Sequence, residues 1–133
     1  MLEGGCHCGA IRYRVQDKPV YHALCHCTDC RRGTGGPAIS WALFRNENFE
    51  ILKGEPKVYA SSESARRHFC AECGTSLFYT NETIFPNMTD IQSATLDDPG
   101  ALPLQIHVQT AERISWMKDI DSLPQFERYP GAE

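Results

Sequence analysis

Seven cysteines in three tight groups constrain this chain more than any other feature. They form a C-x-C, a C-x-C-x-x-C and a C-x-x-C motif, at Cys6, Cys8, Cys25, Cys27, Cys30, Cys70 and Cys73. The number is odd, and the first residues, MLEGGCHCGA, lack the pattern of a secretory signal, so a disulfide framework fits poorly. Several sulfurs on one turn are typical of soft metal sites, since few long loops must then close around the ion. The sequence therefore predicts bound metal, with zinc as the expected ion.

Spacing alone leaves the division of these sulfurs open. Cys27 and Cys30 with Cys70 and Cys73 would form a C-x-x-C…C-x-x-C ribbon, but other partitions satisfy tetrahedral geometry equally well. Seven sulfurs make one closed four-thiolate site and one three-thiolate site. A closed site is structural, whereas an open one leaves a position for water or substrate, so the odd count points to chemistry. A thioredoxin-like redox pair is disfavoured, because no βαβ pattern surrounds either C-x-x-C pair.

Short alternating runs predict a strand-rich, all-β fold. In AIRYRV, apolar side chains alternate with arginine, which is the period of a half-buried strand. Similar runs are VYHAL, AISWALF, FEIL, KVYA, RHF, SLFY and QIHV, and turn clusters such as RGTGGP and LDDPG separate them. The one helix expected is a short turn that starts near Cys27, with Thr28 as its cap and Asp29 in its first turn. Metal staples would support so small a β core.

Composition narrows the classes of function. The chain has 133 residues, 41% hydrophobic and 23% charged, which fits one domain over residues 1–133 of a soluble globular protein. No apolar run approaches the roughly 18 residues of a membrane span, so a cytoplasmic protein without a membrane partner is expected. The formal net charge of -4 argues against nucleic acid as a partner. Local basic pairs at Arg31-Arg32 and Arg66-Arg67 remain candidate sites for a small anion.

Four segments together carry a family resemblance. In order along the chain they are GGCHCGAIRYRV, CHCTDCRRGTGGP, RHFCAECGTSLFY and LDDPGALPLQIHV. They resemble the glutathione-dependent formaldehyde-activating enzyme family, which also includes centromere protein V, and specifically its shorter members. The resemblance runs from about residue 4 to about residue 126. It implies a β-tent, in which small stacked antiparallel sheets are pinned by a structural zinc.

The resemblance also implies which cysteines share a metal. The N-terminal C-x-C and the later C-x-x-C hold the structural zinc in that family, which corresponds here to Cys6, Cys8, Cys70 and Cys73. The central C-x-C-x-x-C holds a second zinc with an open position, which corresponds here to Cys25, Cys27 and Cys30. Two zinc ions are therefore the expected cofactors, and the second site is the expected catalytic one.

Residues beside the cysteines fit this division. Gly9 and Gly74 each follow a cysteine and are free to take positive φ, which lets backbone N–H groups turn toward the sulfurs. Cys30 is expected in the first turn of the short helix, where the helix dipole and the adjacent Arg31 and Arg32 favour the thiolate.

The expected chemistry follows from the open site. A zinc with three thiolates is a weak Lewis acid but is suited to taking an incoming thiol and lowering its pKa. Together with the resemblance, this predicts a carbon–sulfur lyase similar to S-(hydroxymethyl)glutathione synthase, with a small thiol such as glutathione and a small aldehyde such as formaldehyde as partners. The alternatives are a non-catalytic thiol-binding protein and a purely structural zinc module.

Arginines and histidines complete the candidate residues. Arg31, Arg32, Arg66 and Arg67 are candidates for binding the carboxylates of a glutathione-like substrate. Each is also compatible with an ordinary solvated or paired surface charge. The histidines of the two C-H-C segments, His7 and His26, are expected on loop surfaces. The remaining three, His22, His68 and His107, are expected to pack within strands, with proton transfer or a fourth metal ligand as the alternative role for one of them.

Overall fold

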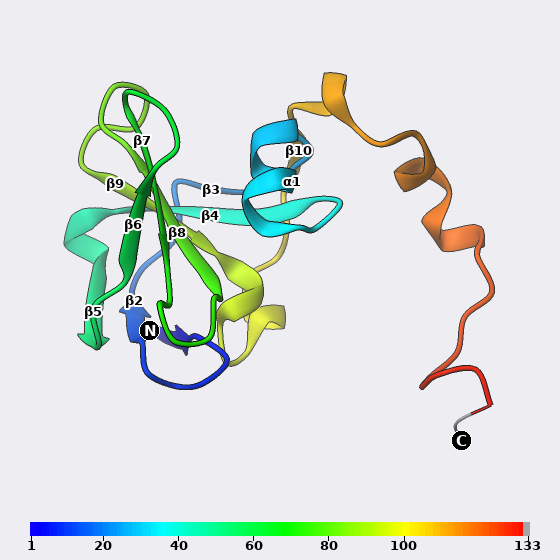
Figure 1. The fold of residues 1–133 in the computed structure, drawn as a ribbon, viewed down its shortest axis with the longest axis horizontal. Coiled ribbons are helices and arrows are strands. Elements are labelled where there is room, and N and C mark those ends of the chain that lie inside the picture. Colours follow the sequence, from blue (N-terminus) through cyan, green and yellow to red (C-terminus); the bar gives the residue numbers. More distant parts are fainter. Residues whose placement is uncertain (132–133) are drawn as a thin grey trace.

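The structure is a computed structural model that describes residues 1–131, and ten strands in this part of the chain form two sheets (Figure 1). The smaller sheet is antiparallel and has the order β1-β2-β5, with bounds Leu2–Gly5, Arg12–Val15 and Phe49–Lys53. The larger sheet has the order β10-β3-β4-β9-β8-β7-β6. In chain order its strands are β3 (Tyr21–Cys25), β4 (Ile39–Arg45), β6 (Lys57–Ala60), β7 (Ala65–Phe69), β8 (Ser76–Asn81), β9 (Met88–Gln92) and β10 (Ile106–Val108).

The all-β expectation is confirmed, with one difference in strand direction. All pairings are antiparallel except that of β10 with β3, which is parallel. A parallel partner requires a long connection, and the chain makes most of the larger sheet before β10 returns beside β3. Each predicted run coincides with a strand, whereas β1 and β9 were not predicted.

One α-helix, α1 (Thr28–Thr34), lies in the described chain at the predicted place. Its cap is not Thr28, as the sequence suggested, but Cys27, whose Sγ accepts a hydrogen bond from the backbone N–H of Cys30 at 3.3 Å. The thiol thus takes the place of the hydroxyl that usually satisfies a free N–H at a helix start. Short 3-10 helices occupy Asn46–Asn48, Ser93–Thr95, Pro99–Ala101, Thr110–Glu112 and Ser115–Ser122.

The main core lies between the two sheets. Tyr13 of β2 and Phe49 of β5 both make edge-to-face contacts with the Phe78 ring of β8, with ring centroids 5.1 Å and 4.9 Å from it. On the same face of the larger sheet, Ala42 and Ile91 stand directly opposite each other in β4 and β9 and are fully buried. Burial of such rings and branched chains is the principal force that holds the two sheets together.

The opposite face of the larger sheet carries a different row of side chains. Residues directly opposite each other in neighbouring strands share a face. Tyr21 pairs with Leu43, Leu43 with Asp90, Asp90 with Tyr79, and Tyr79 with Arg67. We call this set the polar row; it runs across β3, β4, β9, β8 and β7. It places aromatic, acidic and basic groups on the face that is not used for the core between the sheets.

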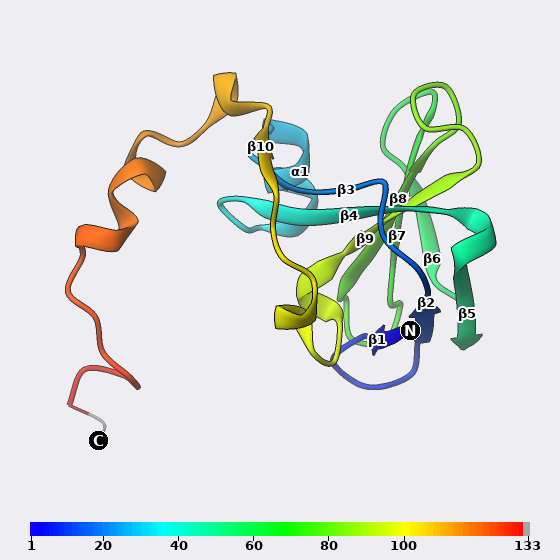
Figure 2. The same cartoon turned by 180° about the vertical axis from the view of Figure 1, so that it is seen from behind.

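The segment after β10 contacts α1 through Glu112 and then extends away from the sheets (Figures 1 and 2). Figures 1 and 2 both show the chain passing α1 and then running away from the sheets toward its C-terminal end. Trp116, Leu123 and Phe126 of this segment are exposed. Through residue 131, no helix combines the length and apolar character that a membrane crossing requires.

Candidate metal centres and the adjoining cavity

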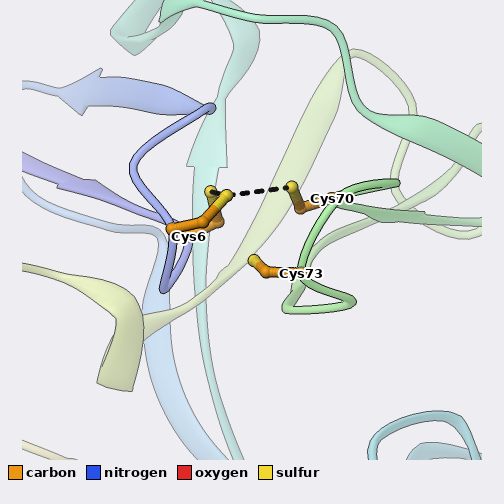
Figure 3. Close-up of side chains that lie close together, drawn as sticks. Cys6, Cys70 and Cys73 are labelled. Carbon is orange, nitrogen blue, oxygen red and sulfur yellow. Dashed lines mark hydrogen bonds between the residues drawn. The ribbon is translucent and has the colours of Figure 1, made fainter.

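A four-cysteine group joins the two sheets. Cys6 and Cys8 lie just after β1, whereas Cys70 and Cys73 lie just after β7, and their four sulfurs all fall within 4.8 Å of one another. In Figure 3 the sulfurs of Cys6, Cys70 and Cys73 point toward one another from these two turns. The sulfurs of Cys6 and Cys8 are 3.7 Å apart and those of Cys8 and Cys70 are 3.8 Å apart. Disulfide sulfurs would be about 2.05 Å apart, so these distances describe free thiols.

The spacing in this group fits a tetrahedral zinc. Zinc–sulfur bonds of about 2.3 Å in a tetrahedron put neighbouring sulfurs about 3.8 Å apart. The sulfur–sulfur distances of 3.7 Å and 3.8 Å match that edge. The donor set is also complete, since four thiolates fill a tetrahedron and leave no position free.

Tight turns with backbone donors surround these sulfurs. Gly9 and Gly74 both have φ of 81°, which confirms the predicted left-handed conformation at these two positions. The backbone N–H of Ile11 then donates to the Cys6 Sγ at 3.2 Å. At the other turn, hydrogen bonds from the hydroxyl and backbone of Thr75 lower the pKa of Cys73 to about 5. Each turn therefore favours one thiolate before any metal is considered, that of Cys6 in the first turn and that of Cys73 in the second. The pKa of Cys8, in contrast, is raised to about 11 by desolvation and by the neighbouring cysteines.

A three-cysteine group lies at the end of the polar-row face. Cys25 ends β3, Cys27 caps α1 and Cys30 lies in the first turn of α1, as predicted. Their sulfurs fall within 4.8 Å of one another, and those of Cys25 and Cys30 are 3.8 Å apart. The distance again matches the edge of a zinc–sulfur tetrahedron. This group fits a metal but supplies three of four tetrahedral ligands.

The three-cysteine group opens on a cavity that the four-cysteine group does not line. The cavity has a volume of about 720 Å³, and all three cysteines of the group line it. Trp41 and four members of the polar row form part of its walls, the four being Tyr21, Asp90, Tyr79 and Arg67. None of Cys6, Cys8, Cys70 and Cys73 lines it. Cavities of roughly 300–1,000 Å³ accommodate small organic ligands.

Arg67 is the positive group of this cavity. Its side chain is buried, with 8% exposed, and Nη2 and Nη1 lie 3.8 Å and 4.0 Å from the Cys30 Sγ. Its guanidinium also lies 5.0 Å above the Tyr79 ring, a cation–π distance. Hydrogen bonds from Cys25 and Cys27, followed by the contact with Arg67, lower the pKa of Cys30 to about 5. Cys30 is therefore the thiol of the group that ionises first.

The other three candidate arginines lie elsewhere. Arg31 donates to the Thr28 hydroxyl at 3.1 Å and to the Glu112 carbonyl at 3.4 Å, so it links α1 to the segment after β10. Arg32 is exposed on α1. Arg66 donates to nearby backbone carbonyls, the shortest being its bond of 2.8 Å to Ala65. Only Arg67 of the four lines the cavity, and substrate binding by any of them stays a prediction.

The histidines next to the cysteines differ from each other. His7 is exposed, as expected, and the backbone N–H of this residue donates to the Thr75 hydroxyl at 3.1 Å. His26 is buried, which corrects the expectation of a loop-surface position. Its Nε2 lies 2.9 Å from the Nδ1 of His107, because β10 pairs with β3 and covers the residue after Cys25.

Asp90 is the cavity residue that sequence reasoning missed. It lines the cavity from β9 and is 6% exposed, and its Oδ1 is buried without a hydrogen-bond partner. Burial, followed by the nearby negative charge of Cys30, raises the pKa of this carboxyl to about 7. In MTDIQ the polar residues Thr89 and Asp90 are adjacent and break the alternation expected of a half-buried strand, so the sequence gives little signal for this residue.

Comparison with known proteins identifies the family. The family described as glutathione-dependent formaldehyde-activating enzyme (GFA) matches residues 1–112, which include both cysteine groups. This chain belongs to the GFA family. A Halomonas elongata protein, provisionally named a glutathione-dependent formaldehyde-activating enzyme, is 28% identical over 145 residues, covering 98% of this chain and 89% of that protein.

One further protein sequence and one crystal structure are also similar to this GFA protein. An uncharacterized lyase of Schizosaccharomyces pombe is 35% identical over 81 residues, covering 59% of this chain and 58% of that protein. A crystal structure of a Rhodobacter sphaeroides protein matches with a TM-score of 0.65 and 24% identity, covering 80% of this chain and all of that one. This last similarity establishes a shared fold.

Proposed function

We propose that this GFA protein is a zinc-dependent carbon–sulfur lyase that forms or cleaves the S-hydroxymethyl adduct of a glutathione-like thiol and formaldehyde or a similar small aldehyde. One observation carries the proposal: a three-cysteine group, one ligand short of a tetrahedral set, opens on a cavity of about 720 Å³. The names of the GFA family and of the lyase from Schizosaccharomyces pombe support the same class of reaction.

The two cysteine groups have different proposed roles. Cys6, Cys8, Cys70 and Cys73 would hold a structural zinc, because they close a tetrahedron away from the cavity. Cys25, Cys27 and Cys30 would hold the second zinc. When bound there, zinc supplies an open coordination position that lowers the pKa of an incoming thiol.

Arg67 has the proposed role of charge partner and substrate anchor. Three thiolates and a dication leave one negative charge, and the guanidinium beside Cys30 offsets it in a buried setting. Arg67 makes no ion pair with a carboxylate in the described chain, and Nη1 and Nη2 each carry a second N–H beside the one directed to the Cys30 Sγ. A substrate carboxylate fits this position by bidentate hydrogen bonding.

The reaction needs little beyond orientation and proton transfer. The thiol sulfur forms a bond to the aldehyde carbon, the carbonyl π electrons move to oxygen, and that oxygen takes up a proton. The reverse reaction breaks the same carbon–sulfur bond and returns the proton. The cavity walls restrict the thiol and aldehyde to one volume, so much of the rate enhancement arises from proximity.

Exchange spectroscopy tests the proposal directly. Glutathione and ¹³C-formaldehyde form their adduct without a catalyst, and NMR exchange spectroscopy measures the rate of interconversion. The zinc-loaded protein is expected to raise this rate in proportion to its concentration, and Cys27→Ser is expected to abolish the increase. Arg32→Met serves as a control on the exposed side of the same helix.

Two outcomes would contradict the lyase proposal. Thiol binding without any acceleration would instead identify a non-catalytic thiol-binding protein. The absence of both thiol binding and acceleration would identify a structural zinc module.

A further inference from the structure

Asp90 lies at the centre of the polar row, between Leu43 of β4 and Tyr79 of β8. The next residue, Ile91, faces the core between the sheets, so the alternation of β9 directs Asp90 to the cavity face. Arg67 follows one strand further along the same row. The register of three adjacent strands therefore fixes an acidic side chain in the same cavity as the three cysteines.

This carboxyl has no partner that would explain its burial. Its Oδ1 is inaccessible and accepts no hydrogen bond, and no ion pair joins it to a cation within the described chain. The Arg67 guanidinium is directed to the Cys30 sulfur and the Tyr79 ring instead. The Tyr79 hydroxyl accepts a hydrogen bond from the Asn81 amide.

An unpaired carboxylate in such a position destabilises the folded state, because burial without a hydrogen bond or an ion pair penalises the charged form most strongly. The neutral carboxylic acid has a smaller penalty and carries a proton that it can donate. Buried acids of this kind are a recurrent means by which proteins keep a proton donor available near neutral pH.

We propose that Asp90 is the proton donor and acceptor for the oxygen of the aldehyde in this cavity. The proposal rests on the proposed function and adds a catalytic residue to it. In adduct formation, the Asp90 carboxylic acid gives its proton to the oxygen that develops negative charge as the sulfur–carbon bond forms. The proton released by the incoming thiol restores the acid, so no other reactant is needed.

In adduct cleavage the same group acts as the base. The Asp90 carboxylate takes the hydroxyl proton, the oxygen electrons re-form the carbonyl, and the carbon–sulfur bond breaks to release the thiolate. The thiolate then receives the proton from Asp90. Atoms, electrons and protons balance in both directions, as microscopic reversibility requires.

The groups that face Asp90 are compatible with this role. They are Tyr21 from β3, Cys30 from α1, Arg67 from β7 and Tyr79 from β8, with Asp29 and Glu112 also lining the cavity. Burial raises the pKa of Asp90 to about 7, and the charge of Cys30 acts in the same direction. Asp90 also lies outside the set of side chains whose ligand atoms group together with Cys25, Cys27 and Cys30.

Asp90→Asn is the closing experiment, because the amide keeps the shape of the side chain but cannot transfer a proton. We expect the catalysed exchange rate at saturating glutathione to fall by about 100-fold or more. The KM for glutathione and the zinc content are expected to stay within twofold of wild type. The matched control is Asp98→Asn, an exposed aspartate outside the cavity, and its rate should equal that of wild type.

A second readout does not depend on turnover. Infrared difference spectra of wild type minus Asp90→Asn should show a protonated carboxyl at pH 6 that is lost by pH 8.5. Absence of this band would overturn the proposal, as would an Asp90→Asn rate within threefold of wild type. Loss of zinc in Asp90→Asn would overturn it in favour of a ligand role. Inactive wild-type protein that nevertheless shows the band would refute the proposed function and hence the catalytic role, leaving only the buried acid.

Discussion

Asp90→Asn should change the dependence of folding stability on pH. In the folded protein, burial and then the charge of Cys30 raise the pKa of Asp90 from 3.8 to about 7. The folded state therefore holds the proton more tightly than the unfolded state. The stabilisation from this proton is complete below about pH 4 and is lost as pH rises through about 7.

The magnitude follows from the size of the shift. Each pKa unit corresponds to about 1.4 kcal/mol, so the full change from 3.8 to about 7 costs about 4 kcal/mol. Between pH 5 and pH 8 the unfolding free energy of the wild-type protein falls by roughly 2–3 kcal/mol for this reason. Asparagine carries no proton to titrate, so the unfolding free energy of Asp90→Asn should not show this decrease. Relative to wild type, Asp90→Asn should therefore become more stable by roughly 2–3 kcal/mol between pH 5 and pH 8.

Urea unfolding of both proteins at pH 5 and pH 8, at one fixed zinc concentration, measures the effect. All seven cysteines are present in both proteins, so the pH dependence of metal binding largely cancels in the comparison. The exposed Asp98→Asn control should track wild type. If the difference in unfolding free energy between wild type and Asp90→Asn is the same at both pH values, the argument from burial is refuted.

Three further predictions concern the metal groups and the core. Cys70→Ser should lose cooperative unfolding in circular dichroism, because it breaks the closed four-cysteine group. Cys27→Ser should stay folded and lose one zinc. Equal destabilisation of the two variants would contradict the division into a structural group and an open group. Arg67→Met should raise the pKa of Cys30, measured by alkylation of the metal-free protein. The same variant should raise the KM for glutathione about tenfold. If both values stay unchanged, Arg67 is neither the charge partner of Cys30 nor the substrate anchor. Phe78→Ala should lower the unfolding free energy by about 3–5 kcal/mol in urea titrations, because its ring packs between both sheets, and a loss below about 1 kcal/mol would contradict that packing.

Much of the fold could be predicted because its signals are local. The alternation in AIRYRV and similar runs specifies half-buried strands, and these strands form as expected. Gly9 and Gly74 could be assigned positive φ because each follows a cysteine in a tight turn, and both have φ of 81°. The short helix near Cys27 was likewise predicted from polar residues that favour a helix start.

The cap of that helix shows where local reasoning fails. Thr28 has the side chain that usually caps a helix, yet Cys27 does so, because the chain must turn at Cys27 to bring its sulfur beside Cys25 and Cys30. The requirement to gather three sulfurs takes precedence over the intrinsic preference of the hydroxyl.

The cavity residues depended on non-local register. Arg66 and Arg67 are neighbours in the sequence, and alternation along β7 sends them to opposite faces. Which of the two faces the cysteines is decided by the pairing of Arg67 with Tyr79, and Asp90 enters the same row only through β9. One sequence without its strand pairings does not contain this information.

The central claim is that the three-cysteine group accepts a thiol from solution. Cobalt replaces zinc in cysteine sites and gives sulfur-to-metal charge-transfer absorption whose intensity reports the number of bound thiolates. Titration of the cobalt-loaded protein with glutathione should increase this absorption to saturation, and Cys27→Ser, with its four-cysteine group intact, should show no increase. An absorption spectrum that does not change with glutathione in the wild-type protein would contradict the account.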